Sequence, residues 1–237
     1  MNRPVRCEDF KGLKLFKYVE KIEYAYDLCK GDVYFGTLSK YRSIEQAQRG
    51  DKHEGTYQEV VNLEFGDSDS EEKKRMLHRL GYNFHATSGV VMNDIVNTIS
   101  HDAYIFCTAL KPLGEEQRSV FGKYCIEIQD AFEFYKCIDE SFNDFYKGLP
   151  YESGCGPIEY EDRESEANQT VLKELAFIKP ISFREQFEFR YLLRPRIKAK
   201  DKIGYIEGDL LPLTLHCKGL EGICKLVEWT TTQSNIY

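Results

Sequence analysis

The 237-residue sequence lacks any apolar run that approaches the length of a membrane span, which argues against a transmembrane protein. Its first residues contain no apolar core of a signal peptide. A strong positive charge is also absent, because the formal net charge is −7. This charge disfavours an extended nucleic-acid surface but is compatible with a local basic groove. We therefore expect a cytoplasmic protein with no membrane partner.

The spacings that are typical of metal sites are missing as well. Eight cysteines stand at positions 7, 29, 107, 125, 137, 155, 217 and 224, and no two have the two-residue gap of a zinc knuckle. The five histidines form no His-Glu-x-x-His group. Several cysteines, such as Cys107 and Cys125, lie in apolar strand-like runs. We expect free thiols in a reducing compartment and no metal site built by the protein.

The patterns that are present predict a β-rich chain with interspersed helices. The 15 Phe and 16 Tyr residues favour sheets over a helical bundle. Few segments are long enough for parallel crossovers, so the sequence predicts an α+β fold with a mostly antiparallel, split β-sheet and flanking helices. We expect a single domain over 1–237, with an insertion at 66–101. Strands are expected at 13–19, 33–38, 58–64, 103–110, 123–128, 186–192 and 224–229. Helices are expected at 20–30, from residue 130 and at 164–177, and a loop or hairpin at 148–163.

The strand at 186–192 has the clearest alternation in the chain. It predicts Gln186, Glu188 and Arg190 on one face of the sheet and aromatic residues on the other. Taken alone, this pattern is typical of an edge strand with a solvated polar face. On that interpretation Arg190 forms a surface ion pair across the strand, and the alternative is that it pairs with Glu188 or contacts a pyrophosphate.

Three short motifs give the chain a resemblance to a known group of proteins. A large family of uncharacterised bacterial and phage proteins opens with a Lys/His-Tyr strand, carries a Cys-Ser/Thr strand midway and places a Gln/Glu-x-Glu strand late. That pattern is in turn similar to the ADP-ribosyltransferase superfamily, whose sheet positions surround NAD. The matching segments here are Leu-Phe-Lys-Tyr at 15–18, Phe-Cys-Thr at 106–108 and Gln-Phe-Glu-Phe-Arg at 186–190.

The resemblance implies a role for each matched position. Glu188 would be the catalytic acid, and Gln186 would face the acceptor. Lys17 or Tyr18 would occupy the first-strand position beside NAD, where Arg or His is usual, and Thr108 the middle one.

The charged loop that follows the strand at 33–38 would flank the NAD cleft. Tyr41 would stack on a ring, and Arg42 or Arg49 would lie near phosphates. This expectation rests on the position of the loop alone.

The chemistry of NAD cleavage suits a fixed carboxylate. Breaking the nicotinamide–ribose bond develops an oxocarbenium-like ribose, as glycoside cleavage does. A carboxylate aimed at this sugar stabilises the developing charge more than the ground state. The resulting hypothesis is an NAD-dependent mono-ADP-ribosyltransferase, with NAD as co-substrate and a protein or nucleic-acid acceptor. The resemblance implies that the protein is either a bacterial toxin with an antitoxin partner or an effector of antiviral defence against phage.

Two further functions use the same residues. Asp51, Glu54 and Glu188 would bind Mg²⁺ in a metal-dependent nuclease, although Arg190 stands where such enzymes usually have a lysine. A non-catalytic binding module would instead hold a partner with its aromatic loops. The sequence leaves these alternatives open.

Overall fold

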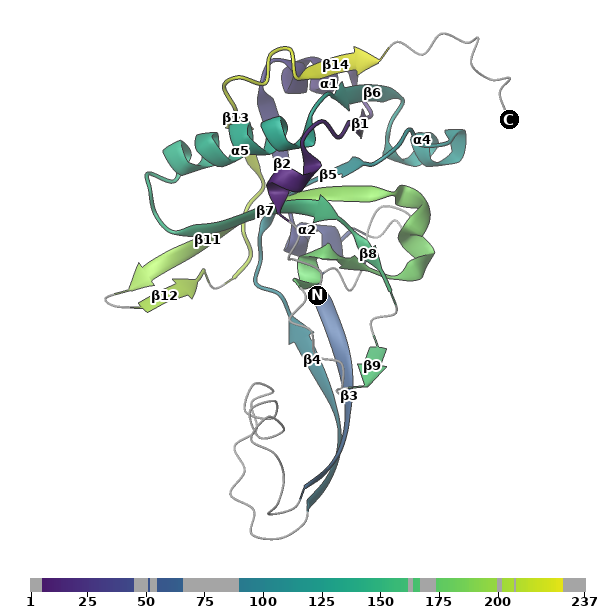
Figure 1. The fold of residues 1–237 in the computed structure, drawn as a ribbon, viewed down its shortest axis with the longest axis vertical. Coiled ribbons are helices and arrows are strands. Elements are labelled where there is room, and N and C mark those ends of the chain that lie inside the picture. The colour runs from purple at the N-terminus through teal and green to yellow at the C-terminus, as the bar shows by residue number, and fades with distance from the viewer. Residues whose placement is uncertain are drawn as a thin grey trace.

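A computed structural model describes residues 6–44, 51, 55–65, 90–161, 164–166, 174–199, 202–206 and 208–227. The chain has the predicted α+β fold, in which helices flank a mostly antiparallel sheet (Figure 1). The strands of the main sheet are β1 (Leu15–Val19), β2 (Asp32–Thr37), β5 (Tyr104–Ala109), β6 (Tyr124–Ile128), β7 (Tyr151–Pro157), β11 (Glu188–Ala199), β12 (Lys202–Tyr205), β13 (Leu213–His216) and β14 (Cys224–Val227). The α-helices are α1 (Ile22–Cys29), α2 (Leu38–Arg42), α4 (Glu115–Phe121) and α5 (Ala131–Phe145).

Strand β5 divides the main sheet into two arms. One edge of β5 pairs along its length with β11. The other edge pairs with β2 at Tyr104 and Ile105, and with β1 at Ala109. Beyond these pairs, one arm continues from β1 to β6 and β14, and the other continues from β2 to β13. The strands therefore form the split arrangement that the sequence predicts.

Helices α1 and α5 cover one face of the sheet, where the largest apolar core lies. Phe134 of α5 stacks on Phe106 of β5, with ring centroids 5.4 Å apart, and contacts Tyr191 of β11. Asp130 caps α5, because its Oδ1 accepts hydrogen bonds from the backbone N–H groups of Phe132 and Glu133. This cap confirms the predicted start of the helix.

The opposite face of the sheet carries shorter elements and a smaller apolar cluster. These elements are α2, the 3₁₀-helices η3 (Leu175–Phe177) and η4 (Ile181–Gln186), and the parallel pair formed by β8 (Glu159–Tyr160) and β10 (Ile178–Lys179). The cluster there contains Leu38, Ile105, Ala176 and Leu192. A third 3₁₀-helix, η1 (Cys7–Phe10), contacts α5 and β7.

A long hairpin extends away from the sheet (Figure 1). It consists of β3 (Thr56–Phe65) and β4 (Val90–Ile99), and β9 (Glu164–Glu166) pairs with β3 in parallel. The expected insertion at 66–101 therefore contains β4, which pairs with β3. Residues 66–89 lie outside the described residues.

Three expectations about the late part of the chain are wrong. The segment 164–177 is not a helix in its described residues, because it begins as β9 and ends as η3. The segment 148–163 is not a local hairpin, since β7 pairs with the distant β11. Strand β11 is not a solvated edge, because β5 and β7 pair with its two sides. Propensity and alternation describe each strand locally and carry no information about such long-range pairing.

No helix among the residues that the structure describes is long and apolar enough to cross a membrane.

Candidate functional site

The polar residues of the late strand are separated by a sharp change in the backbone at Phe187. Phe187 adopts a left-handed conformation, with φ 45° and ψ 42°, between η4 and β11. Gln186 is therefore the last residue of η4, and β11 begins at Glu188. The prediction that Gln186 and Glu188 share the face of one strand is wrong, because the alternation of a strand does not continue through a left-handed residue.

A lysine brings Gln186 and Glu188 together again. Lys179, the last residue of β10, donates to Oε1 of Gln186 at 3.0 Å and to Oε2 of Glu188 at 2.5 Å. On the other side of the carboxylate, Nε of Arg190 donates to Oε1 of Glu188 at 2.6 Å. The Arg190 guanidinium also donates to the backbone carbonyl of Ala176. Both carboxylate oxygens of Glu188 are thus held by a cation.

This triad of Lys179, Glu188 and Arg190 is almost completely buried. The three residues are 4%, 4% and 1% exposed. The expectation that Arg190 forms a surface ion pair is therefore wrong, and the alternative that it pairs with Glu188 is confirmed. Burial acts to raise the pKa of Glu188, but the neighbouring Arg190 and Lys179 outweigh it and hold that pKa well below its usual range. The carboxylate is ionised throughout the physiological pH range.

Two tyrosines and a thiol surround the triad. Tyr160 accepts a hydrogen bond from the backbone N–H of Glu188 at 2.8 Å. Cys107 is the register partner of Arg190 across β5 and β11, and it lies near enough to Tyr41 to contribute to the shift in the pKa of that tyrosine. Burial, followed by the negative charge of Glu188, raises the pKa of Cys107 to about 12, so this thiol stays protonated.

A glycine makes the position of Tyr41 possible. A Cβ atom at Gly36 would lie 3.0 Å from Cζ of the Tyr41 ring. Because Gly36 has no side chain, the Tyr41 ring of α2 can lie directly against the backbone of β2. Burial is the largest cause that raises the pKa of Tyr41 well above its usual value, and Cys107 and the charge of Glu188 act in the same direction. Tyr41 thus lies beside the triad, as the sequence suggests for a residue near the site.

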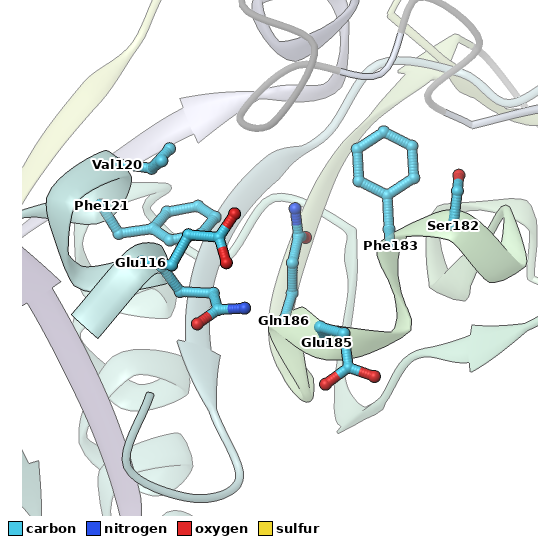
Figure 2. A pocket seen from close by; sticks show the side chains of 8 residues that line it. Glu116, Val120, Phe121, Ser182, Phe183, Glu185 and Gln186 are labelled. Atoms are coloured by element: carbon cyan, nitrogen blue, oxygen red, sulfur yellow. The ribbon is translucent and has the colours of Figure 1, made fainter. Parts of the chain in front are cut away.

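A cavity of about 230 Å³ opens next to Gln186, between α4 and η4. Figure 2 shows the α4 side chains facing those of η4, with Gln186 between Phe121 and Phe183. Its walls are acidic, amide, hydroxyl, aliphatic and aromatic side chains: Glu116, Gln117, Val120, Phe121, Ser182, Phe183, Glu185 and Gln186. Gln186 therefore connects the cavity to the buried Glu188 through their shared bond to Lys179.

The structure does not bring all the sequence-predicted residues to this site. Thr108 alternates with Cys107 on β5, so it points to the α5 face of the sheet, and its hydroxyl donates to the carbonyl of Phe189 at 3.1 Å. Lys17 alternates with Tyr18 on β1 and also belongs to the α5 face. Its ammonium lies 4.7 Å from the centroid of the Phe106 ring and donates to the carbonyl of Cys107. Thr108 and Lys17 thus lie on the opposite face of the sheet from Glu188.

The other predicted residues have different surroundings. Tyr18 lies on the same face as Glu188, in a separate apolar cluster, and its hydroxyl accepts a hydrogen bond from the backbone N–H of Leu113 at 2.9 Å. Arg42 ends α2 and is partly buried. Asp51 is buried, whereas Arg49 and Glu54 lie outside the described residues.

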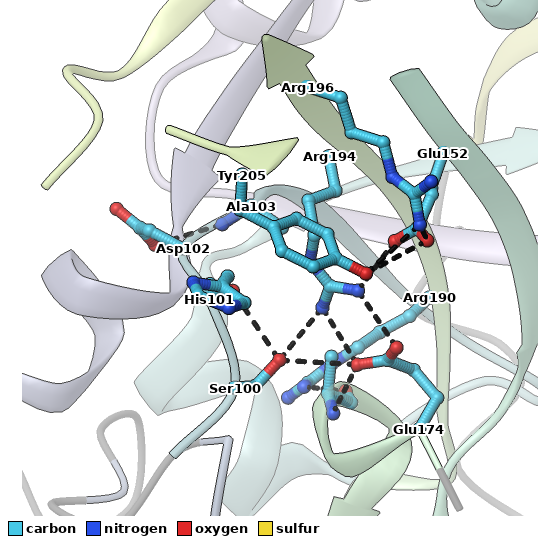
Figure 3. Close-up of polar contacts among 11 residues, drawn as sticks. Ser100, His101, Asp102, Ala103, Glu152, Glu174, Arg190, Arg194, Arg196 and Tyr205 are labelled. Carbon is cyan, nitrogen blue, oxygen red and sulfur yellow. Dashed lines mark hydrogen bonds and ion pairs between the residues drawn. The ribbon is translucent and has the colours of Figure 1, made fainter. Parts of the chain in front are cut away.

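A second ion-paired network lies farther along β11 (Figure 3). Arg194 donates to both oxygens of Glu174 at 2.7 and 2.8 Å, and to Glu152 at 3.0 Å. Arg196 pairs with Glu152, and the hydroxyl of Tyr205 also contacts that carboxylate. Arg194 further donates to Ser100, at the base of the β3–β4 hairpin. This network joins several elements and faces no described cavity.

No local pattern in the sequence selects Lys179, Tyr160 or Cys107 as site residues. Lys179 follows an apolar run and precedes Pro180, and nothing local indicates that its ammonium is buried. The only available signal is a lysine in an otherwise apolar segment, upstream of a Glu-x-Arg pair of opposite charges. The contact of Lys179 with Glu188 depends on the pairing of β8 with β10, which no local pattern specifies.

The described residues contain no group of three or more His, Cys, Asp or Glu side chains arranged to hold a metal ion. Both oxygens of Glu188 already pair with cations, so Mg²⁺ would have to displace Lys179 or Arg190. The geometry thus gives no support to the nuclease hypothesis within the described part of the chain. Comparison with protein-family models, with curated proteins and with solved structures gives no match.

Proposed function

We propose that the protein is an NAD-dependent ADP-ribosyltransferase in which Glu188 is the catalytic carboxylate. One observation carries this proposal: an ionised carboxylate is fixed between Lys179 and Arg190, and the same lysine holds Gln186 in the wall of a cavity. A fixed anion beside a cavity is the arrangement that stabilises a positively charged sugar in the transition state.

The low pKa of Glu188 defines what this residue does in the proposed reaction. A carboxylate that stays ionised does not act as a general acid, so its role is electrostatic. Glu188 would accept a hydrogen bond from a ribose hydroxyl and stabilise the charge that develops at the anomeric carbon. Substrate binding would replace the Lys179–Glu188 bond, while Lys179 keeps its bond to Gln186.

The cavity between α4 and η4 suits the acceptor in this proposal. Gln186 is neutral and lines the cavity, so its amide orients an acceptor nucleophile without competing for protons. Tyr41 and Arg42 of α2 are the proposed contacts to NAD, with Tyr41 supported by its position beside Cys107 and Glu188. Lys17 and Thr108 are not part of this revised site, because they lie on the other face of the sheet.

The experiment compares Glu188→Gln with Glu174→Gln. Both changes remove one carboxylate charge from an arginine cluster on the same face of β11, but only the first alters the proposed site. With labelled NAD and cell lysate, we expect Glu188→Gln to lower label transfer and NAD hydrolysis by roughly 10²–10³-fold. Glu174→Gln should keep the wild-type rate. Circular dichroism and thermal unfolding establish that each variant is folded.

Equal rates for wild type and a folded Glu188→Gln variant would remove Glu188 from the mechanism. A second function, a non-catalytic binding module, is favoured by the burial of Glu188 and by the engagement of both its oxygens. Wild-type protein that neither transfers label nor hydrolyses NAD would support this module and overturn the transferase proposal.

A further inference from the structure

Two cysteines that are far apart in the sequence lie against each other beside α5. Cys7 belongs to η1 and Cys155 to β7, 148 positions later in the chain. The Cys7 thiol donates to the carbonyl oxygen of Cys155 at 4.0 Å, and the two thiols are close enough to shift each other's pKa. The thiol of Cys217, by contrast, donates to the carbonyl of Leu215 at 3.7 Å, only two positions away in the chain.

The surroundings of this pair make the two thiols unequal. The hydrogen bond from Cys155 lowers the pKa of Cys7 to about 7, with a smaller contribution in the same direction from Tyr135, whereas the charge of Glu8 acts to raise it. The same hydrogen bond, and then burial, raises the pKa of Cys155. Both cysteines are partly accessible to solvent. Cys7 is therefore the nucleophile of the pair, and Cys155 is the thiol that activates it.

We propose that Cys7 and Cys155 form a reversible disulfide when the protein meets a small-molecule disulfide such as oxidised glutathione. The Cys7 thiolate attacks one sulfur of the oxidant, forms a mixed disulfide and releases one glutathione thiolate. Cys155 then loses its proton and attacks the Cys7 sulfur, which releases the second glutathione thiolate. The two cysteines are oxidised, and one oxidised glutathione is reduced to two glutathione molecules after the two protons are transferred.

The cross-link has a structural consequence for the centre of the sheet. Phe10 of η1 packs edge-on against Phe189 of β11, with ring centroids 4.9 Å apart, and Cys155 is the register partner of Tyr191. Oxidation thus ties the segment that covers β11 to the strand that pairs with it. Because the cross-link closes a loop of more than a hundred residues, it restricts the unfolded chain strongly and raises the melting temperature.

The experiment uses the full chain, first reduced and then equilibrated with oxidised glutathione. Free thiols are blocked by alkylation, and peptides are mapped by mass spectrometry. We expect six alkylated cysteines, one linked peptide pair that contains Cys7 and Cys155, and a melting temperature several degrees above that of the reduced protein. Dithiothreitol should restore all eight free thiols.

Three variants test the identity of the pair. Cys7→Ser and Cys155→Ser should each abolish the linked peptide and the rise in melting temperature, whereas Cys29→Ser should keep both. The wild-type map alone is decisive should Cys155→Ser fail to fold. The proposal is overturned by eight alkylated cysteines after oxidation, by glutathione that stays on Cys7, or by links scattered over other cysteines. None of these readouts depends on the transferase proposal.

Discussion

Two ion-paired clusters on the same face of β11 differ in how much water reaches their carboxylates. In the triad, the side chain of Glu188 is 5% exposed, and so is that of Lys179. In the Arg194 network, the side chains of Glu174 and Glu152 are 41% and 32% exposed. Both clusters bury an arginine, but only the triad also buries the acid.

This difference decides what happens when a partner is removed. A carboxylate at the surface is solvated again after its arginine is lost, so the cost is modest. A carboxylate that stays buried keeps an uncompensated charge, which typically costs 3–5 kcal/mol. The same burial that makes the triad costly to break gives Glu188 the fixed, dry surroundings in which a charge acts strongly on a substrate.

The largest effect on stability is expected from Arg190→Met. This change leaves Glu188 buried with one cation fewer and leaves the carbonyl of Ala176 without the arginine donor. We expect the free energy of unfolding to fall by about 3–5 kcal/mol, measured by denaturant titration. A loss below about 1 kcal/mol, the scale of an exposed ion pair, would mean that the triad tolerates the change as a surface pair does.

The pH dependence of stability should reveal the low pKa of Glu188. A carboxyl group whose pKa is lower in the folded than in the unfolded protein contributes stability that is fully present above the unfolded value, about 4.3. That contribution is lost as the pH falls from there toward the folded pKa. Wild-type stability should therefore decrease by up to about 1.4 kcal/mol per pH unit more steeply than that of Glu188→Gln.

Measurement of unfolding free energies from pH 6 to pH 3 checks this expectation. Parallel curves for the two proteins would show that the folded and unfolded pKa values of Glu188 are similar.

Arg194→Met is the matched counterpart of Arg190→Met on the same strand. It removes bonds to Glu174, Glu152 and Ser100, but both acids reach water. We expect a loss of about 1–2 kcal/mol by the same denaturant titration, since only part of the interaction is desolvated. A loss equal to that of Arg190→Met would remove the distinction between the two clusters.

The smallest effect is expected on the other face of the sheet, from Thr108→Val. This nearly isosteric change removes the hydroxyl that donates to the carbonyl of Phe189 and should cost about 1 kcal/mol. NAD turnover should be unchanged, because Thr108 points away from Glu188. A folded Thr108→Val variant with a large loss of turnover would show that Thr108 takes part in the reaction. It would contradict the placement of the site on the face of the sheet that carries Glu188.

Each of the seven predicted strands overlaps a strand of the structure, because alternation and β-branched or aromatic content are local properties, but the sequence analysis missed β4, β7, β12 and β13. It also identified Glu188 and Arg190 as a polar pair on one strand face, and the α+β class with a mostly antiparallel sheet and flanking helices is confirmed. It failed at Gln186, because a phenylalanine gives no sign of the left-handed conformation at Phe187 that ends the alternation.

The remaining errors concern relations between distant segments. The burial of Glu188 depends on Lys179 from another strand and on β7 and β5 at either side. Thr108 and Cys107 are adjacent in one motif, yet a strand directs them to opposite faces. A motif match gives only the order of residues along the chain. To predict which of these residues meet in one site, the register and direction of each strand must also be known.

The pairing of β11 also determines when the protein can mature during its synthesis. Strand β5 meets β11 only after some eighty further residues have been made, and β7 waits for the same strand. Until the ribosome has released residues 188–199, the nascent chain exposes strand edges that are prone to aggregation. A chain terminated before this point lacks Glu188 and the centre of the sheet together, so the proposed activity cannot precede the stable fold.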